Sequence, residues 1–324
     1  MRIIANLNPD VFDEIEELVE TNGYSSVDQF IRSAVQNQLT LEREGKSVRS
    51  EPTEDRGHTD PFWKKDIPAN PPLADAYRVN RDEKLLFQQY YRFFPLIVVM
   101  AEVARVTSRD SEPIALDKFR SHMEEEVVRI RDPLRDWEAE NDVKKTERKS
   151  TGLPKSDVKN PDYSMKRFLD HYVGRVRKRD NQPLAIGSDL KFISYRPLQE
   201  NDGCLVQLTP AGNELLQLGN PILNNGPEAA TLSDDERRCI AKQIRDALPE
   251  EYSLMKFVYE VLDESDGGTY TNYLNKFESF LLDSPGFSDD DPSEDRVRSA
   301  TAGVLSRMVE LGMLERGRRR GVYI

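Results

Sequence analysis

Residues 1–43 alternate between apolar and polar positions in a way that predicts one strand and two helices. Arg2 to Leu7 alternate with a period of two, which predicts a short strand. Apolar residues then recur at helical spacing from Val11 to Val19 and from Phe30 to Leu39, on either side of a turn at Gly23. Such a short segment buries too little apolar surface to fold alone, and a lone strand has unpaired edges. We therefore expect two copies to associate, with their strands paired antiparallel across a two-fold axis.

The order and spacing of these elements resemble the ribbon-helix-helix family of the Arc and MetJ type. Four features carry the resemblance: the strand, Asn8-Pro9 at the start of the first helix, the turn Gly23-Tyr24-Ser25-Ser26, and Phe30-Ile31-Arg32-x-Ala34 in the second helix.

The resemblance implies a homodimer whose two-stranded ribbon enters the major groove of double-stranded DNA. The base-reading positions of that family map onto Arg2, Ile4 and Asn6. The amides that anchor a phosphate map onto the start of the second helix, at Ser25 and Ser26. The alternative interpretation is that this segment only dimerises the chain, and the apolar Ile4 at the ribbon centre favours it.

The rest of the chain divides into a linker and two further regions. Residues 44–76 are rich in proline and charge and have little periodicity, which is typical of a flexible linker. Residues 77–222 and 223–324 each combine helical patterns with short strand-like runs. The fold class expected is therefore mainly α with small β elements: a ribbon-helix-helix segment followed by two winged-helix-like α+β domains.

The first of these regions predicts a buried core and a basic helix. Lys84 to Val106 is too densely apolar for one amphipathic stripe, which predicts a central buried helix interrupted or kinked near Pro95. Leu116 to Asp142 predicts a second helix. Tyr163 to Arg179 predicts a helix with a cationic outer face, and its candidate DNA contacts are Arg167, Arg175, Arg177, Lys178 and Arg179.

Two predicted strands follow the basic helix, Leu190 to Tyr195 and Cys204 to Leu208. The next segment, Leu208-Thr209-Pro210-Ala211-Gly212, starts another helix with Thr209 as its cap. A basic helix followed by a hairpin and this Leu-Thr-x-x-Gly sequence resembles a winged helix-turn-helix. Such domains place a recognition helix in the major groove, although many winged helices bind protein instead.

The second region, residues 223–324, is also predicted to end in a helix followed by a hairpin, as a winged helix does. Ser233 opens a helix with a capping box, helices are predicted at Leu254 to Leu262 and Tyr270 to Leu282, and a long helix runs from Ser293 to Leu311. We expect Arg296, Arg298 and Arg307 to face outward from that long helix. The basic hairpin that follows supplies the candidate phosphate contacts Arg316, Arg318, Arg319 and Arg320.

Composition restricts how this chain can bind DNA. The net charge is -12, so a uniform surface would repel DNA, and binding needs local basic faces whose grip weakens as salt rises. Arginine is used more often than lysine on an acidic background, which favours a halophilic source. The region from Tyr77 onward also resembles uncharacterised haloarchaeal regulators.

The sequence offers little for catalysis or metal binding. Cys204 and Cys239 are far apart, and His58, His122 and His171 lie in separate segments without metal-ligand spacing. No P-loop, nucleophile elbow or dinucleotide fingerprint occurs. We expect no cofactor and no enzymatic activity. We also expect a cytoplasmic protein, because no signal peptide or membrane-length apolar run is seen.

These observations together predict a homodimeric, sequence-specific DNA-binding protein that acts as a transcriptional regulator. The alternative is an architectural or adaptor protein, in which the N-terminal segment only dimerises and the winged helices bind a protein partner.

Overall fold

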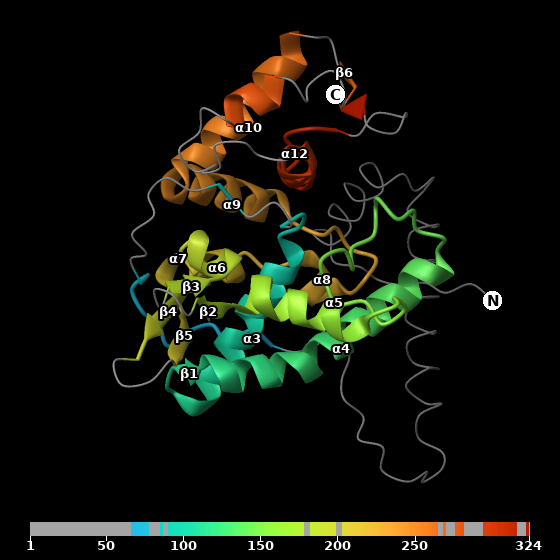
Figure 1. The fold of residues 1–324 in the computed structure, drawn as a ribbon. Helices are drawn as coiled ribbons and strands as arrows, with labels where there is room; N and C mark the ends of the chain where they lie inside the picture. Colours follow the sequence, from blue (N-terminus) through green and yellow to red (C-terminus); the bar gives the residue numbers. More distant parts are fainter. Residues whose placement is uncertain are drawn as a thin grey trace, which may run out of the picture. The chain divides into compact units, whose positions relative to one another are not determined.

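The computed structural model divides the chain into two compact units, residues 1–59 and 60–324. The residues that it describes all belong to the second unit and comprise 66–77, 85–86, 90–177, 182–198, 203–264, 268–269, 276–281, 294–315 and 322–323. The predicted ribbon-helix-helix segment therefore lies outside the described residues. The described part is mainly helical with small antiparallel sheets, which agrees with the predicted fold class of mainly α with small β elements (Figure 1).

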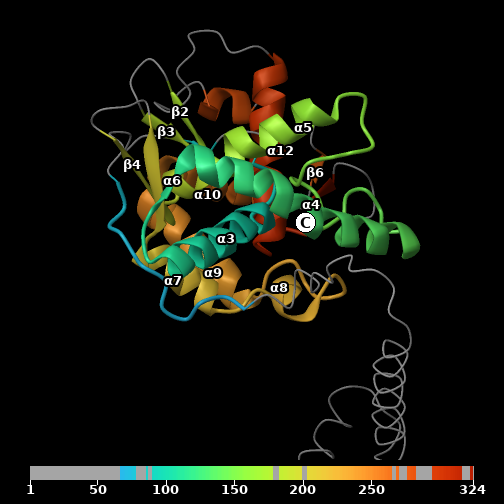
Figure 2. The ribbon, with the colours of Figure 1, turned by 90° about the horizontal axis from the view of Figure 1, so that it is seen from below.

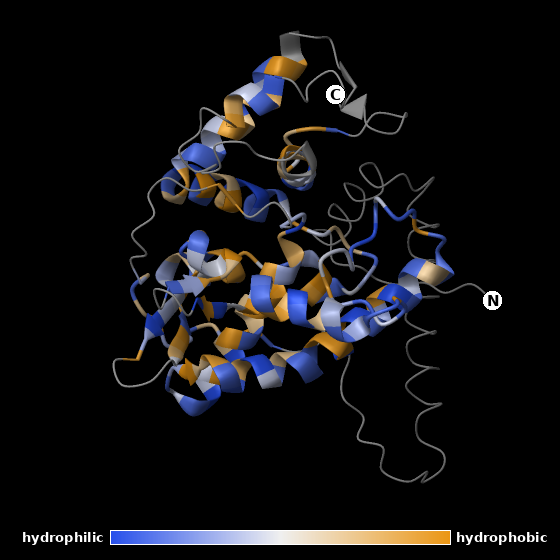
Figure 3. Cartoon of the chain, in the orientation of Figure 1, coloured by the Kyte–Doolittle hydropathy of each residue, from blue (hydrophilic) through white to orange (hydrophobic). Residues whose placement is uncertain are grey.

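Helix α3 (Phe94–Asp110) is the buried centre of this unit. Its side chains are buried on almost every face, because it packs against the main sheet, α4, α7 and η2. Figures 1 and 2 both show it enclosed by these elements, and hydrophobic residues gather where the helices face one another (Figure 3). The helix is interrupted near Pro95 and not kinked there, because residues 90–93 are not helical. The helix starts at Phe94, so Pro95 occupies the first turn, where its missing N–H is not needed.

Helix α4 (Leu116–Glu140) confirms the amphipathic pattern of its sequence. A stripe that includes Phe119, Met123, Val127 and Ile130 is buried, and the remaining face carries most of the charge. This spacing of three and four residues places the apolar groups on one side of the helix.

A three-stranded antiparallel sheet covers one side of α3. Its order is β1 (Ile114–Ala115), β5 (Cys204–Leu208) and β4 (Ile193–Pro197). Alternate residues of β5 are buried, as period-two strand geometry requires. Thr209 then caps α7 (Pro210–Gln217): its hydroxyl accepts the Gly212 N–H at 3.0 Å and donates to the Lys191 carbonyl at 2.8 Å. The predicted strand Cys204 to Leu208 and the cap are confirmed, whereas the strand predicted to begin at Leu190 begins at Ile193.

The predicted basic helix is shorter than expected. The chain forms α5 (Pro161–Phe168) and one π-helical turn, η2 (Leu169–Val173), and then leaves the helix at Gly174. Gly174 has φ +112°, and a Cβ there would lie 2.9 Å from the Tyr195 ring, so only glycine fits. Strand β2 (Arg175–Arg177) follows and pairs with β3 (Gln182–Leu184), which is succeeded by the short helix α6 (Ile186–Asp189). The prediction that Arg175 and Arg177 continue the helix is therefore wrong.

The C-terminal part contains α8 (Pro221–Asn225), α9 (Asp234–Ala247), α10 (Pro249–Glu264), a helical segment at 276–281 and α12 (Glu294–Glu310). The capping box that Ser233 forms with Glu236 is present. Strand β6 (Gly268–Thr269) pairs antiparallel with β7 (Val322–Tyr323). In the sequence β6 precedes α12 and β7 follows it. None of the described helices is long and apolar enough to cross a membrane.

Arg307 of α12 does not face outward as predicted; it is among the largest fully buried side chains. Its Nε and Nη2 donate to Glu251 Oε1 of α10 at 2.9 and 2.5 Å, and its Nη1 donates to the Tyr90 carbonyl at 3.0 Å. The other oxygen of Glu251 accepts the Leu86 N–H at 3.0 Å. The ion pair therefore connects α10 and α12 to Leu86 and Tyr90, which precede α3. The carboxylate of Glu251 offsets the cost of burying the Arg307 guanidinium.

A second buried carboxylate, Glu310 of α12, contacts the same segment. Glu310 Oε2 accepts the N–H of Phe93, the residue that precedes α3, at 2.6 Å. Burial is the main reason that the pKa of Glu310 rises to about 7, although Arg92, the Phe93 and Phe94 amides and Arg237 all favour its charged form. Its Oε1 has no hydrogen-bond partner among the described groups. The start of α3 is thus capped by a residue from the far end of the chain.

Replacing Arg307 with alanine should destabilise the protein by about 3–5 kcal/mol, because Glu251 would remain buried without a counter-charge. Arg298→Ala on the exposed face of the same helix is the matched control and should change stability by about 0.5 kcal/mol or less. Urea unfolding followed by circular dichroism measures both. Equal effects of the two substitutions would show that the buried ion pair contributes nothing specific.

Glu310 should make stability fall as the pH rises from about 4.5 to about 7. In that window the folded chain keeps the Glu310 proton while the unfolded chain loses it, which costs at most about 3 kcal/mol. Glu310→Gln keeps an acceptor for Phe93 but cannot ionise. The thermal midpoint of the native chain relative to this variant should therefore decline with pH across the window. Parallel profiles would contradict the account.

Candidate functional site: a basic cleft beside α5

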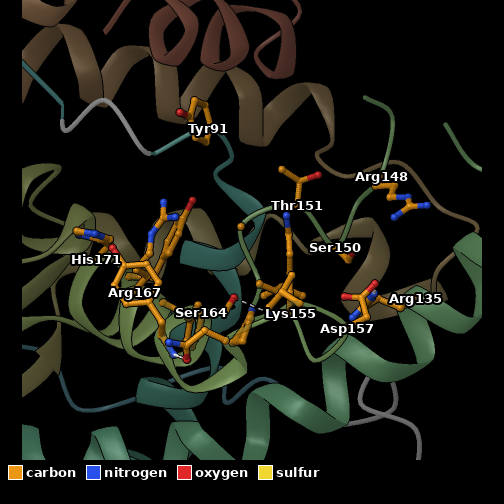
Figure 4. A pocket seen from close by; sticks show the side chains of 18 of the residues that line it. Tyr91, Arg135, Arg148, Ser150, Thr151, Lys155, Asp157, Ser164, Arg167 and His171 are labelled. Atoms are coloured by element: carbon orange, nitrogen blue, oxygen red, sulfur yellow. Dashed lines mark hydrogen bonds and ion pairs between the residues drawn. The ribbon is translucent and has the colours of Figure 1, made fainter. Parts of the chain in front are cut away.

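A cleft of about 920 Å³ opens between the loop that joins α4 to α5, the helix α5 itself, η2 and Tyr91 (Figure 4). In Figure 4, Arg167 and His171 lie on one side of the cleft, whereas Arg135, Asp157 and Arg148 lie on the other. Among the described side chains that line it, six are basic and one is acidic. The basic ones are Arg135, Lys145, Arg148, Lys155, Lys159 and Arg167, and the acid is Asp157.

This charge distribution is the reverse of the chain as a whole, whose net charge is -12. Asp157 is already engaged by Arg135, which also donates to Ser156 Oγ at 3.2 Å. The contact explains why the pKa of Asp157 lies below its ordinary value, since the hydrogen bond from Arg135 favours the carboxylate. The cleft therefore offers a concentrated positive field to an anion.

The loop wall of the cleft is fixed from behind by a buried carboxylate. Glu138 of α4 accepts the Ser150 N–H at 2.7 Å and the Ser150 hydroxyl at 2.6 Å. Lys149, next in the chain, donates to the carbonyls of Pro227 and Ala229 at 2.6 and 2.7 Å and lies 4.5 Å from the Trp137 ring centre. Burial lowers the pKa of Lys149. Its ammonium thus holds the loop in place and is not directed at a ligand.

The floor is formed where the loop meets η2 and the start of α3. Gly152 has φ +97°, and a Cβ there would lie 2.8 Å from Pro95 Cγ and 3.0 Å from the Tyr172 hydroxyl. That hydroxyl donates to the Arg92 carbonyl at 3.1 Å, and burial raises the pKa of Tyr172 so that it stays protonated. Arg92 Nη2 in turn donates to the Thr146 carbonyl of the loop at 3.0 Å. The segment that Arg307 and Glu310 hold therefore also positions the cleft.

Helix α5 supplies the opposite wall. Asn160 caps it by accepting the Tyr163 N–H at 3.0 Å, and Ser164 Oγ accepts the Lys155 N–H at 2.8 Å, so loop and helix are fastened together. Tyr163 is 59 % exposed, and the guanidinium carbon of Arg167 lies 6.0 Å from its ring centre. An exposed aromatic ring next to an arginine is a combination that stacks on planar ligands.

His171, half-buried, lines the cleft in its neutral form. Burial lowers its pKa to about 4, and the nearby Arg167, Arg175 and Lys166 act in the same direction, while Asp170 opposes them. The His171 ring packs edge-on against the Tyr90 ring, with the two ring centres 6.0 Å apart. At neutral pH the imidazole therefore contributes hydrogen-bonding capacity without charge.

Among the predicted DNA contacts whose side chains the structure describes, Arg167 alone lines this cleft. Arg175 is exposed and Arg177 half-buried on β2, and Arg298 is exposed on α12. Arg296 belongs to α12, but its side chain is outside the described part. The others lie outside the described residues: Arg2, Ile4, Asn6, Ser25, Ser26, Lys178, Arg179, Arg316, Arg318, Arg319 and Arg320.

Sequence reasoning missed five of the six basic residues, because they lie on α4 and in a loop without periodicity. The density of basic residues between Lys144 and Arg167 was the available signal. Within the described residues, no group of three or more potential ligands could hold a metal ion. No family model, curated protein or solved structure matched the chain.

Gly152→Ala should destabilise the protein by about 1–3 kcal/mol, since alanine is strained at this φ and its Cβ would collide with Pro95 and Tyr172. Gly203→Ala is the matched control. Its φ is outside the left-handed region, and its Cβ would meet only the flexible Leu198 side chain at 3.2 Å. Thermal unfolding compares the two. A Gly152 variant as stable as the Gly203 variant would contradict the rigid floor described above.

Proposed function

We propose that the protein is a homodimeric DNA-binding protein that acts as a transcriptional regulator. The N-terminal segment pairs two chains and reads bases, and the basic cleft of the second unit grips the phosphate backbone. The observation that carries the proposal is the gathering of six basic side chains around the cleft in a strongly acidic chain. Local positive charge of this kind supplies most of the affinity for nucleic acid.

The order of elements around the cleft supports this proposal. A winged-helix domain runs helix, strand, helix, helix, then a hairpin whose second strand pairs with the first strand. Here α3, β1, α4 and α5 precede the hairpin β4–β5, and β5 lies between β1 and β4. In this comparison α4 and α5 take the places of the helix-turn-helix pair, so the cleft lies on the recognition side. The β2–β3 hairpin and α6 are additions between α5 and β4.

The C-terminal part shares fewer features with a winged-helix domain than the region around the cleft does. Strand β6 precedes α12 and pairs with β7 after it, as the first and last strands of a winged helix do. The sequence between α12 and β7 carries Arg316, Arg318, Arg319 and Arg320, which suit phosphate contact. By contrast, the sequence joining β4 to β5 contains Glu200 and Asp202, so the first hairpin is not expected to grip DNA.

The alternative is an adaptor that dimerises through its N-terminal segment and binds a protein partner. The apolar Ile4 at the centre of the predicted ribbon favours that alternative. The concentration of charge in the cleft argues against it, because interfaces between proteins are depleted in lysine.

Replacing Lys155, Lys159 and Arg167 with glutamine should weaken binding to every DNA sequence and reduce the slope of log affinity against log salt by about two to three units. These side chains contact phosphates in the proposal, so sequence preference should not change. Fluorescence anisotropy with a DNA fragment selected by the protein, at several salt concentrations, measures both quantities.

The matched control replaces Arg238, Arg245 and Lys256, three exposed cations paired within their own helices, and should leave the slope unchanged. Arg2→Ala combined with Asn6→Ala should remove sequence preference while the dimer persists. If the cleft variant and its control bind DNA with the same slope, the cleft does not contact phosphates.

A further inference from the structure

The interior of the cleft has a volume that contact with duplex DNA does not use. A double helix is a convex cylinder, so its phosphates reach the rim of a hollow and not its floor. The space of about 920 Å³ is of the size that encloses small ligands. Its walls are fixed by the Glu138–Ser150 and Ser164–Lys155 hydrogen bonds, so the pocket exists before a ligand arrives and little ordering cost is expected.

The lining changes character from the rim to the floor. The exposed ends of Lys155 and Lys159 lie at the rim, whereas Leu153, Phe168 and Tyr172 are buried at the floor. Phe168 and Tyr172 stack with ring centres 5.9 Å apart. A ligand that satisfies both zones is anionic at one end and flat and apolar at the other.

Aromatic side chains flank the space between these zones. Tyr91 comes from the segment before α3 and lies apart from Arg167 of α5 (Figure 4). Tyr163, also on α5, lines the cleft too, with its ring centre 6.0 Å from the Arg167 guanidinium carbon. His171, half-buried, also lines the cleft, and its imidazole is neutral at neutral pH. A heteroaromatic ring is able to stack on the tyrosines and hydrogen-bond there, while a phosphate is held by the lysines and arginines.

We infer that the cleft binds a nucleoside phosphate as a small effector, with its base among Tyr91, Tyr163 and His171 and its phosphates on Arg167, Lys155 and Arg148. A simple inorganic anion leaves the aromatic floor unused, and an uncharged nucleoside leaves the cations unused. The inference rests on the proposed function for its regulatory meaning only: a ligand held by Arg167 and Lys155 competes with the DNA backbone for the same groups.

Isothermal titration of the full chain with ATP in magnesium-free buffer, without DNA, tests the site directly. ATP should bind with a dissociation constant below about 100 µM, and adenosine and inorganic phosphate should each bind at least tenfold more weakly. Tyr163→Ala and Arg167→Gln should each weaken ATP binding about tenfold. Arg245→Gln, an exposed arginine of α9, should leave it unchanged.

Two results would overturn the inference: no measurable ATP binding, or inorganic phosphate binding as tightly as ATP, which would mark a general anion surface. Circular dichroism of each variant separates loss of binding from loss of fold. A second arm adds ATP to the preformed DNA complex and should release the DNA. ATP binding by a chain that retains no DNA fragment would refute the proposed function and leave the nucleotide site standing, so the two failures are distinguishable.

Discussion

The buried charges of α10 and α12 hold the segment from Tyr90 to Phe93, and the arrangement of the second unit depends on this. Arg307, which is paired with Glu251, binds the Tyr90 end of the segment, and Glu310 binds the Phe93 end, next to the first turn of the central helix. On its opposite side the same segment bonds to Thr146 and Tyr172, which shape the basic cleft. A buried ion pair adds little net stability but fixes geometry when both partners are present. Here the Arg307–Glu251 pair connects α12 to the cleft beside α5, whose residues lie more than 130 positions earlier in the sequence.

The cleft reconciles an acidic protein with the binding of anions. Net charge governs long-range repulsion, but a ligand within a Debye length responds to the charges nearest to it. Six cations outnumber one carboxylate, which is itself paired with Arg135, so positive charge dominates locally. Because the loop and α5 are fastened together by hydrogen bonds, the cations are presented by a fixed framework. In our proposals the same arrangement holds a phosphate backbone at the rim and a nucleoside phosphate in the interior.

Local chemistry was enough to predict many elements from the sequence. The Thr209 cap, the Ser233 capping box and the apolar stripe of α4 all depend on neighbours within a few residues. The errors at Gly174 and Arg307 have a common cause, since each is decided by a partner distant in sequence. The cleft was largely missed for the same reason: its cations come from a helix and an aperiodic loop that only the fold brings together. The base-reading positions Arg2, Ile4 and Asn6 lie outside the described residues and stay predictions.

The central claim is that one chain contacts DNA through both its N-terminal strand and the cleft beside α5. Photo-crosslinking of the full-length protein to a DNA fragment that it selects from genomic DNA, followed by mass spectrometry, tests this claim most directly. The account predicts crosslinked peptides from two places, residues 1–7 and residues 144–167. Crosslinks confined to other segments, or the failure of the protein to retain any fragment, would contradict it.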